Sequence, residues 1–340
     1  MYRSIILILV ACTCILLNCA QAFGDSWDSV VFREDCDADG MPDPSKWVIN
    51  HPPNWWWVMG RTHFPNPDPW LPTSEFPIVT SGVCRIKHHL YNPYDGGSPN
   101  TTFLGGEIHT FMEFEPNRSY RFEARVRFNP GDPPYVPCPN GVVASFFLYG
   151  YDGSKSDEID FEFLTNQMND DENYPNGDPV FLNTWDESLQ KPQCLCLDCI
   201  PPAGLDLTEW NTFRIYWYPD EPRVEWWWLD PVNGWTLLRV ETDPAFVPDE
   251  SMALYFNFWA STAAWPCAYD AGLQPVNDPG ENQKCAYEID YVEVRASSVV
   301  PALSARGVIL FFILLVMGAS VGVIRRRVIK RRMKGVLTPV

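Results

Sequence analysis

Three carboxylates occupy every second position of a short apolar segment in the middle of the chain. Glu158, Asp160 and Glu162 alternate there with one Ile and two Phe residues. In a β-strand successive side chains point to opposite faces, so the acids share one face and the apolar residues share the other. Neighbouring carboxylates repel one another and lose hydration, which costs stability. This cost indicates that the acidic face has a chemical function.

Two carboxyl groups on one face can cleave a glycosidic bond. One attacks the anomeric carbon and the other protonates the leaving oxygen, and retention of configuration requires a separation of about 5–5.5 Å. The Cα atoms of Glu158 and Glu162 lie about 13 Å apart on a flat strand. Spacing alone therefore leaves the mechanism open, because only a curved sheet brings such side chains together.

The segment 156–164, with the sequence SDEIDFEFL, resembles the catalytic signature of glycoside hydrolase family 16. It has the short form that is typical of lichenases and xyloglucan endotransglycosylases. The resemblance implies Glu158 as the nucleophile, Glu162 as the general acid/base, and Asp160 as the residue that orients the nucleophile. It implies a retaining endo-β-glycanase acting on a β-glycan. A transglycosylase and a non-catalytic carbohydrate-binding protein are the alternatives.

Other segments resemble the same family in the same order. They are residues 34–47, 103–110, 120–126, 210–217, 257–259 and 287–292. The reaction requires no cofactor. The resemblance leaves open a structural Ca²⁺, with Glu34 and Asp290 as its candidate ligands.

Sugar binding needs flat apolar platforms with a few polar groups. The long Pro- and Trp-rich stretch 51–73 and the strands around the acids supply them. Our candidates for substrate binding are Trp57, Arg61, Asn183, Trp185, Trp259 and Trp265. Core packing is the alternative role for the Trp residues, and an ion pair is the alternative for Arg61.

The rest of the chain predicts an all-β fold. Short apolar or alternating runs are separated by Pro, Gly, Asn and Asp, with 32 Pro in all, and amphipathic helical periodicity is almost absent. The expected strands are 79–88, 105–115, 120–128, 142–149, 158–164, 180–185, 212–218, 223–229, 236–241, 253–260 and 287–295. We predict one β-sandwich jelly roll of two large antiparallel sheets over residues 23–296.

The two ends of the chain have the composition of targeting segments. Residues 1–22 read as a secretory signal peptide. After a linker at 297–306, the uncharged run 307–324 predicts a transmembrane helix, and the basic residues of 325–340 predict a cytosolic tail. This end also resembles the sorting signal of bacterial exosortase substrates, which implies a sorting protease as a partner. The expected location is therefore exported, at the cell surface or outside the cell.

Charge and cysteine content agree with an exported protein. The net charge is −18, and because the last eight cations follow residue 295, residues 1–295 carry −26. Such a field repels nucleic acids, so no nucleic-acid partner is expected. Eight of the 11 Cys lie beyond the signal, and an even number in an exported domain predicts disulfides. A zinc site in the cluster 194–199 is the alternative.

Overall fold

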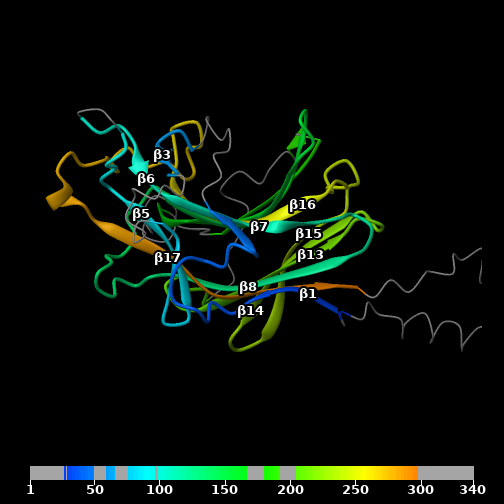
Figure 1. Ribbon diagram of the computed structural model, residues 1–340. Coiled ribbons are helices and arrows are strands. Elements are labelled where there is room, and N and C mark those ends of the chain that lie inside the picture. The colour runs from blue at the N-terminus through cyan, green and yellow to red at the C-terminus, as the bar shows by residue number, and fades with distance from the viewer. Residues whose placement is uncertain are drawn as a thin grey trace, which may run out of the picture. The chain divides into compact units, whose positions relative to one another are not determined.

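A computed structural model describes residues 27, 29–49, 59–65, 76–95, 99–166, 180–187, 189–190 and 204–297. These residues all belong to the first of two compact units, Met1–Ser297, into which the chain divides. Within them the strands form two sheets that lie one above the other (Figure 1). The predicted all-β sandwich is confirmed.

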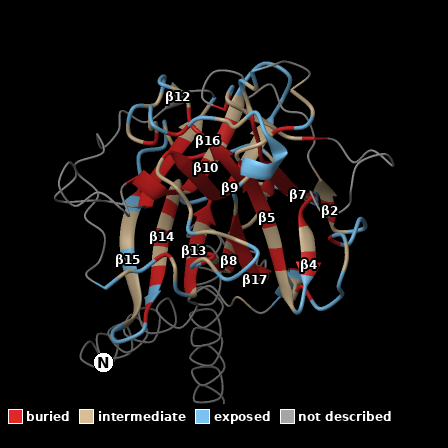
Figure 2. Ribbon diagram, turned by 90° about the vertical axis from the view of Figure 1, so that its left-hand side faces the viewer, coloured by how far each residue is buried: buried red, intermediate tan, exposed pale blue. Residues whose placement is uncertain are grey.

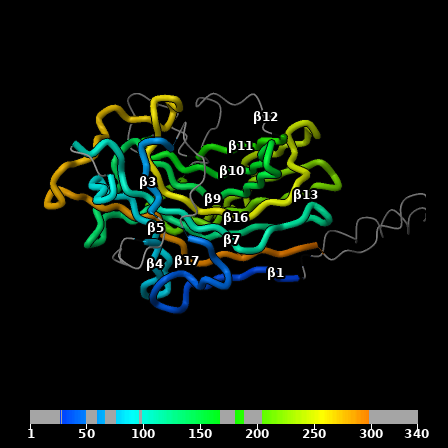
Figure 3. Tube along the Cα trace, turned by 45° about the horizontal axis from the view of Figure 1, so that its top comes forward, coloured from blue at the N-terminus to red at the C-terminus, as the bar shows by residue number. Residues whose placement is uncertain are grey.

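The sheet that carries the acidic segment has seven strands among the described residues, in the order β12-β11-β10-β9-β16-β7-β2. We call it the upper sheet. Its strands are β2 (Trp47–Ile49), β7 (Gly106–Phe114), β9 (Val142–Tyr151), β10 (Ser156–Leu164), β11 (Val180–Asp186), β12 (Leu189–Gln190) and β16 (Met252–Ala260). All its pairs are antiparallel. Figure 3 shows β11, β10, β9, β16 and β7 side by side in this order.

The lower sheet has ten strands in the described part of the chain, in the order β15-β14-β13-β8-β17-β5-β6-β3, with β1 added to β17 and β4 to β5. Its strands are β1 (Ser29–Glu34), β3 (Thr62–His63), β4 (Ile78–Thr80), β5 (Val83–His89), β6 (Phe103–Leu104), β8 (Tyr120–Phe128), β13 (Asn211–Tyr218), β14 (Arg223–Asp230), β15 (Gly234–Glu241) and β17 (Lys284–Ala296). A short 3-10 helix, η2 (Pro279–Glu281), precedes β17.

The core fills the space between the sheets, where Figure 2 shows the buried residues concentrated. It is rich in aromatic rings. Phe161 of β10 stacks on Phe146 of β9 and meets Phe213 of the lower sheet at 5.1 Å. In β14, Trp226 and Trp228 are buried whereas Trp227 between them is only half-buried, which confirms the alternation expected of a strand.

Most predicted strands lie within three residues of their expected ends. The segment 79–88 is different, because it forms the hairpin of β4 and β5 and not one strand. Ser81 and Gly82, with φ angles of +53° and +76°, form the left-handed turn between them. Two consecutive positive φ angles match the right-handed twist of a two-residue hairpin.

The predicted C-terminal transmembrane helix requires a correction. The described residues contain no helix long and apolar enough to cross a membrane, and the fold class that the structure supports is an all-β sandwich alone. Hydrophobicity was a weak basis for that helix, because an 18-residue run is at the lower limit of a membrane span. Residues 307–324, the sorting signal and the signal peptide lie outside the described residues.

Candidate active site

The acidic segment forms β10, which lies between β9 and β11 in the upper sheet. Ile159 and Phe161 are fully buried in the core, so the predicted division into a core face and an acidic face is confirmed. Glu158, Asp160 and Glu162 line a cleft of about 410 Å³ on the outer face of this sheet. We call this face the cleft face.

The cleft lining comes from four strands and two loops. It consists of Met59, Phe147, Tyr149, Ser156, Glu158, Asp160, Glu162, Phe181, Asn183, Trp185, Trp259, Ala264 and Trp265. Six of these residues are aromatic and none carries a positive charge. Aromatic walls around a small polar centre are the usual composition of a sugar-binding cleft.

Strand register places a specific neighbour beside each acid. On β9, Tyr149 lies opposite Glu158 and Phe147 lies opposite Asp160. On β11, Trp185 lies opposite Glu158 and Asn183 lies opposite Asp160. The predicted residues Asn183 and Trp185 thus come directly beside the acids.

The three acids have raised pKa values because they share a poorly hydrated site. Removal from water raises the pKa of Glu158 to about 7, while a hydrogen bond between its carboxyl and that of Asp160 lowers it. Desolvation and the charge of Glu158 raise the pKa of Glu162 well above its usual range. Asp160 is 3% exposed, and its pKa is also raised well above normal by desolvation and by both neighbouring acids. No lysine or arginine among the described lining residues offsets these effects.

The end of the cleft next to Glu162 is apolar. Trp265 stacks on Trp259 with ring centroids 5.9 Å apart and meets the edge of Phe181 at 5.3 Å. Trp259 is 1% exposed, whereas Trp265 is half-buried. The ring that offers its surface to a ligand is therefore Trp265, and Trp259 supports it from below.

Arg61 is not among the described residues of this lining. Arg61 donates hydrogen bonds to the backbone carbonyls of Ser261, Asp270 and Leu273, and it lies over the ring of Phe103. These contacts give its guanidinium group a structural role in joining loops. Trp57 lies outside the described residues.

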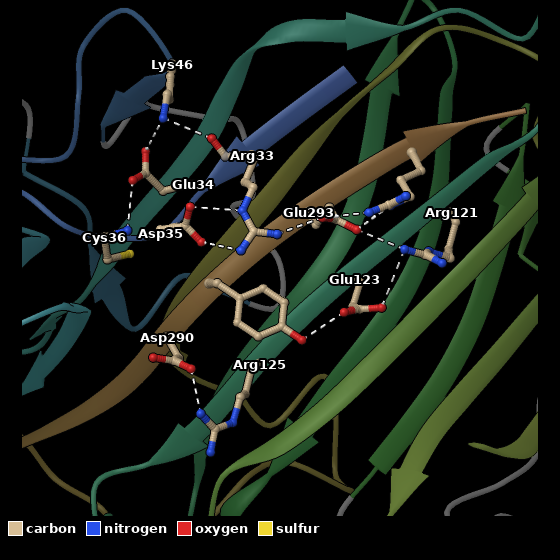
Figure 4. A network of polar contacts seen from close by, with 12 residues as sticks. Arg33, Glu34, Asp35, Cys36, Lys46, Arg121, Glu123, Arg125, Asp290 and Glu293 are labelled. Carbon is tan, nitrogen blue, oxygen red and sulfur yellow. Dashed lines mark hydrogen bonds and ion pairs between the residues drawn. The ribbon is translucent and has the colours of Figure 1, made fainter. Parts of the chain in front are cut away.

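The two candidate calcium ligands have cationic partners. Glu34 lies 3.2 Å from the ammonium of Lys46, and Asp290 lies 2.6 Å from the guanidinium of Arg125 (Figure 4). Because a cation already contacts each carboxylate, the two residues as they lie do not fit a calcium site. Calcium binding there stays a prediction.

A buried carboxylate anchors the first residues of β10. Asp157 accepts hydrogen bonds from the backbone N–H groups of Glu187, Asp249 and Glu250. It therefore ties the catalytic strand to the end of β11 and to the loop that precedes β16. Within the described residues, ligand atoms of Asp157, Asp186 and Asp249 lie within 4.8 Å of one another.

The model of glycosyl hydrolases family 16 matches residues 120–293, more than half of the chain. The chain belongs to this family. It is a glycoside hydrolase, and the match includes all three acids of β10. No curated protein matches the chain in sequence.

Solved structures of similar fold share little sequence with this hydrolase. A prokaryotic β-1,3-1,4-glucanase (lichenase) from a mouse hindgut metagenome has 18% identity and a TM-score of 0.53, covering 77% of this chain and 97% of that one. The β-glucanase of Bacillus licheniformis has 16% identity and a TM-score of 0.52, covering 80% and 99%. The catalytic domain of an endo-1,3-β-glucanase (laminarinase) from Thermotoga petrophila RKU-1 has 17% identity and a TM-score of 0.52, covering 79% and 98%. At these identities the likeness concerns the fold.

Six residues of the cleft lining were not predicted from the sequence, and two of them lie on β9. Phe147 and Tyr149 line it, but β9 is apolar at nearly every position and shows no alternation. The sequence signal that locates these two residues is the hairpin formed by β9 and β10. If β9 and β10 pair as antiparallel neighbours, the residues opposite the acids must share their face.

Proposed function

We propose that this family 16 hydrolase is an exported, endo-acting β-glycanase that works by retaining double displacement. Glu158 is the nucleophile and Glu162 is the general acid/base. Asp160, hydrogen-bonded to Glu158, orients the nucleophile. The observation that carries this proposal is the position of all three acids on one aromatic cleft that has no cation in its described lining.

The poorly hydrated cleft raises the pKa of both glutamates. The nucleophile must be ionised while the acid is protonated. The pKa of Glu158 is raised to about 7, while that of Glu162 is raised well above its usual value. The first step of the proposed mechanism requires that Glu158 loses its proton before Glu162 as the pH rises.

We infer a β-glucan substrate because the similar structures are those of a lichenase, a β-glucanase and a laminarinase. Release of reducing ends from barley β-glucan, laminarin, xyloglucan, agarose and carrageenan tests this directly. Glu158→Gln and Glu162→Gln should each remove nearly all activity on the preferred polymer. Normal activity in either variant contradicts the assigned roles.

Transglycosylation is the second candidate, and the apolar cleft end favours it. Trp265 presents an aromatic surface next to Glu162, on which an acceptor sugar could stack in place of water. Product analysis with an added oligosaccharide acceptor separates the two reactions. Elongated products indicate transfer, whereas shortened products alone indicate hydrolysis.

A further inference from the structure

A row of polar side chains crosses the upper sheet beside Glu162. Strand register places Ser145 of β9 opposite Glu162, Asn257 of β16 opposite Ser145, and Glu107 of β7 opposite Asn257. These positions share the cleft face, because residues two positions along β9, β10 and β16 line the cleft. The row thus leads away from the acid/base across three neighbouring strands.

The two middle members of this row are buried without hydrogen-bond partners in the described structure. Ser145 is 2% exposed and Asn257 is 0% exposed. The Ser145 Oγ and both polar side-chain atoms of Asn257 have no partner among the described residues. Most buried polar groups in proteins do have one, so such an arrangement requires an explanation. Apolar residues of similar size would fill the same space without this cost.

Ser145 is the direct cross-strand neighbour of Glu162 on β9. Cross-strand neighbours on one face have Cβ atoms about 4.5–5.5 Å apart. A serine hydroxyl and a glutamate carboxyl at that separation can meet directly or through one water. No hydrogen bond to the Glu162 carboxyl is seen in the described part of the chain, so the position beside it is open to such a contact.

No lysine or arginine lies among the described residues that line the cleft around Glu162. Its own strand contributes Glu158 and Asp160, and β11 contributes the uncharged Phe181 and Asn183. Across the cleft face the titratable groups are Tyr149 on β9, Tyr255 on β16, and Glu107 and His109 on β7. Ser145 is therefore the nearest neutral donor on the adjoining strand.

We propose that Ser145 is a positioning residue for Glu162. The hydroxyl donates a hydrogen bond to the Glu162 carboxylate whenever that group is ionised. This role rests on the proposed function, in which Glu162 alternates between two protonation states.

Glu162 is ionised halfway through each catalytic cycle. In the first step its proton passes to the leaving oxygen, the glycosidic bond breaks, and Glu158 forms a bond with the anomeric carbon. In the second step a water gives a proton to Glu162 while its oxygen attacks that carbon and the bond to Glu158 breaks. Between the steps a carboxylate stands in a poorly hydrated site, and the Ser145 hydroxyl supplies the donor that water would otherwise provide.

The direct test is the pKa of Glu162, measured by NMR titration of protein carrying ¹³C-labelled glutamate carboxyl groups, with Glu162→Gln used to assign the signal. Ser145→Ala should raise this pKa by about one unit, which corresponds to a tenfold change in proton affinity, because the ionised form loses its donor. Ser145→Thr keeps the hydroxyl and should restore the wild-type value. An unchanged or lowered pKa in folded Ser145→Ala overturns the proposal.

Thr184→Val is the matched control. Thr184 is also fully buried, and its Oγ1 has no partner among the described residues, but it lies opposite Ile159 on the core face of β11. Its removal should leave the pKa of Glu162 unchanged. If Ser145→Ala does not fold, Ser145→Cys, which replaces the hydroxyl by a weaker donor, should give a smaller rise, and no rise there contradicts the proposal equally.

Activity gives a second, separable measurement. In Ser145→Ala the alkaline limb of kcat/KM should move to higher pH, because Glu162 stays protonated longer. When the substrate is an aryl glycoside with an activated leaving group, the acidic limb of the pH profile for the second step should also move to higher pH. A wild-type protein that cleaves no glycan refutes the proposed function, whereas the NMR titration still decides the role of Ser145.

Discussion

The indole Nε1 of Trp226 in the lower sheet donates a 2.8 Å hydrogen bond to the backbone carbonyl oxygen of Asp160 in the upper sheet. Trp226 is fully buried, so this bond passes through the core and ends on the catalytic strand. A carbonyl oxygen has two lone pairs, so it can accept this bond in addition to a sheet bond. The lower sheet therefore holds β10 in position at Asp160, the residue midway between Glu158 and Glu162.

Trp226→Phe should weaken catalysis as well as stability. It keeps an aromatic ring in the core but removes the donor to Asp160, and a lost buried hydrogen bond costs about 1–3 kcal/mol. We expect a lower Tm together with a decrease in kcat at unchanged KM. Trp228→Phe is the control, because its Nε1 donates to Asn211, away from β10. Equal kcat losses in both variants would indicate general loosening of the core.

The raised pKa values predict that acid removal stabilises the protein. An acid whose pKa is higher in the folded state than in the unfolded chain binds protons more tightly when folded, so stability falls as the pH rises between the two values. For Glu158 this interval runs from the ordinary 4.5 to about 7. Glu158→Gln should therefore raise the Tm at pH 8, by several degrees, and have little effect at pH 4. Thermal denaturation across this range measures it, and a Tm that falls at pH 8 contradicts the prediction.

The pH dependence of activity follows from the same two groups. With Glu158 as the nucleophile and Glu162 as the acid, kcat/KM should rise as Glu158 ionises near pH 7 and fall as Glu162 loses its proton. The expected optimum is thus neutral to alkaline. Initial rates on the preferred glucan between pH 4 and 10 provide the profile. An optimum near pH 4 would mean that the cleft does not desolvate the acids as described.

Alternation predicted the two faces of β10 because polar and apolar residues alternate from Glu158 to Phe163. The same reasoning could not find Phe147 and Tyr149, since their neighbours on β9 are equally apolar. For Arg61, its carbonyl partners lie about 200 positions away in sequence, at Ser261 and beyond. Contacts of this kind depend on the tertiary fold, and local sequence patterns carry no information about it.

The stacked pair of Trp residues predicts different effects for its two members. Trp265→Ala removes the surface that faces a ligand and should raise KM about tenfold, because a stacked aromatic contact contributes up to about 1.5 kcal/mol. Trp259→Phe changes a ring that is almost fully covered, so KM should change little. Binding of a non-cleaved oligosaccharide to the Glu158→Gln background measures affinity without turnover. A larger effect at Trp259 would show that Trp265 is not the sugar platform.

The cysteines predict two specific cross-links. In the structure Cys36 and Cys84 carry free thiols that are hydrogen-bonded to each other, and so do Cys138 and Cys285, whereas Cys267 already takes part in a disulfide. During folding in the presence of glutathione disulfide, each pair should exchange its two thiol hydrogens for one S–S bond and release two molecules of reduced glutathione. Because the Cys36–Cys84 bond closes a loop of intermediate length, its loss in Cys36→Ser/Cys84→Ser should cost about 3–4 kcal/mol of stability.

Peptide mapping under non-reducing conditions tests both cross-links. It should yield one disulfide-linked pair of peptides that contains Cys36 and Cys84 and another that contains Cys138 and Cys285. Recovery of these thiols unpaired from oxidatively folded protein would contradict the expected cross-links and confine the disulfides of this domain to other cysteines.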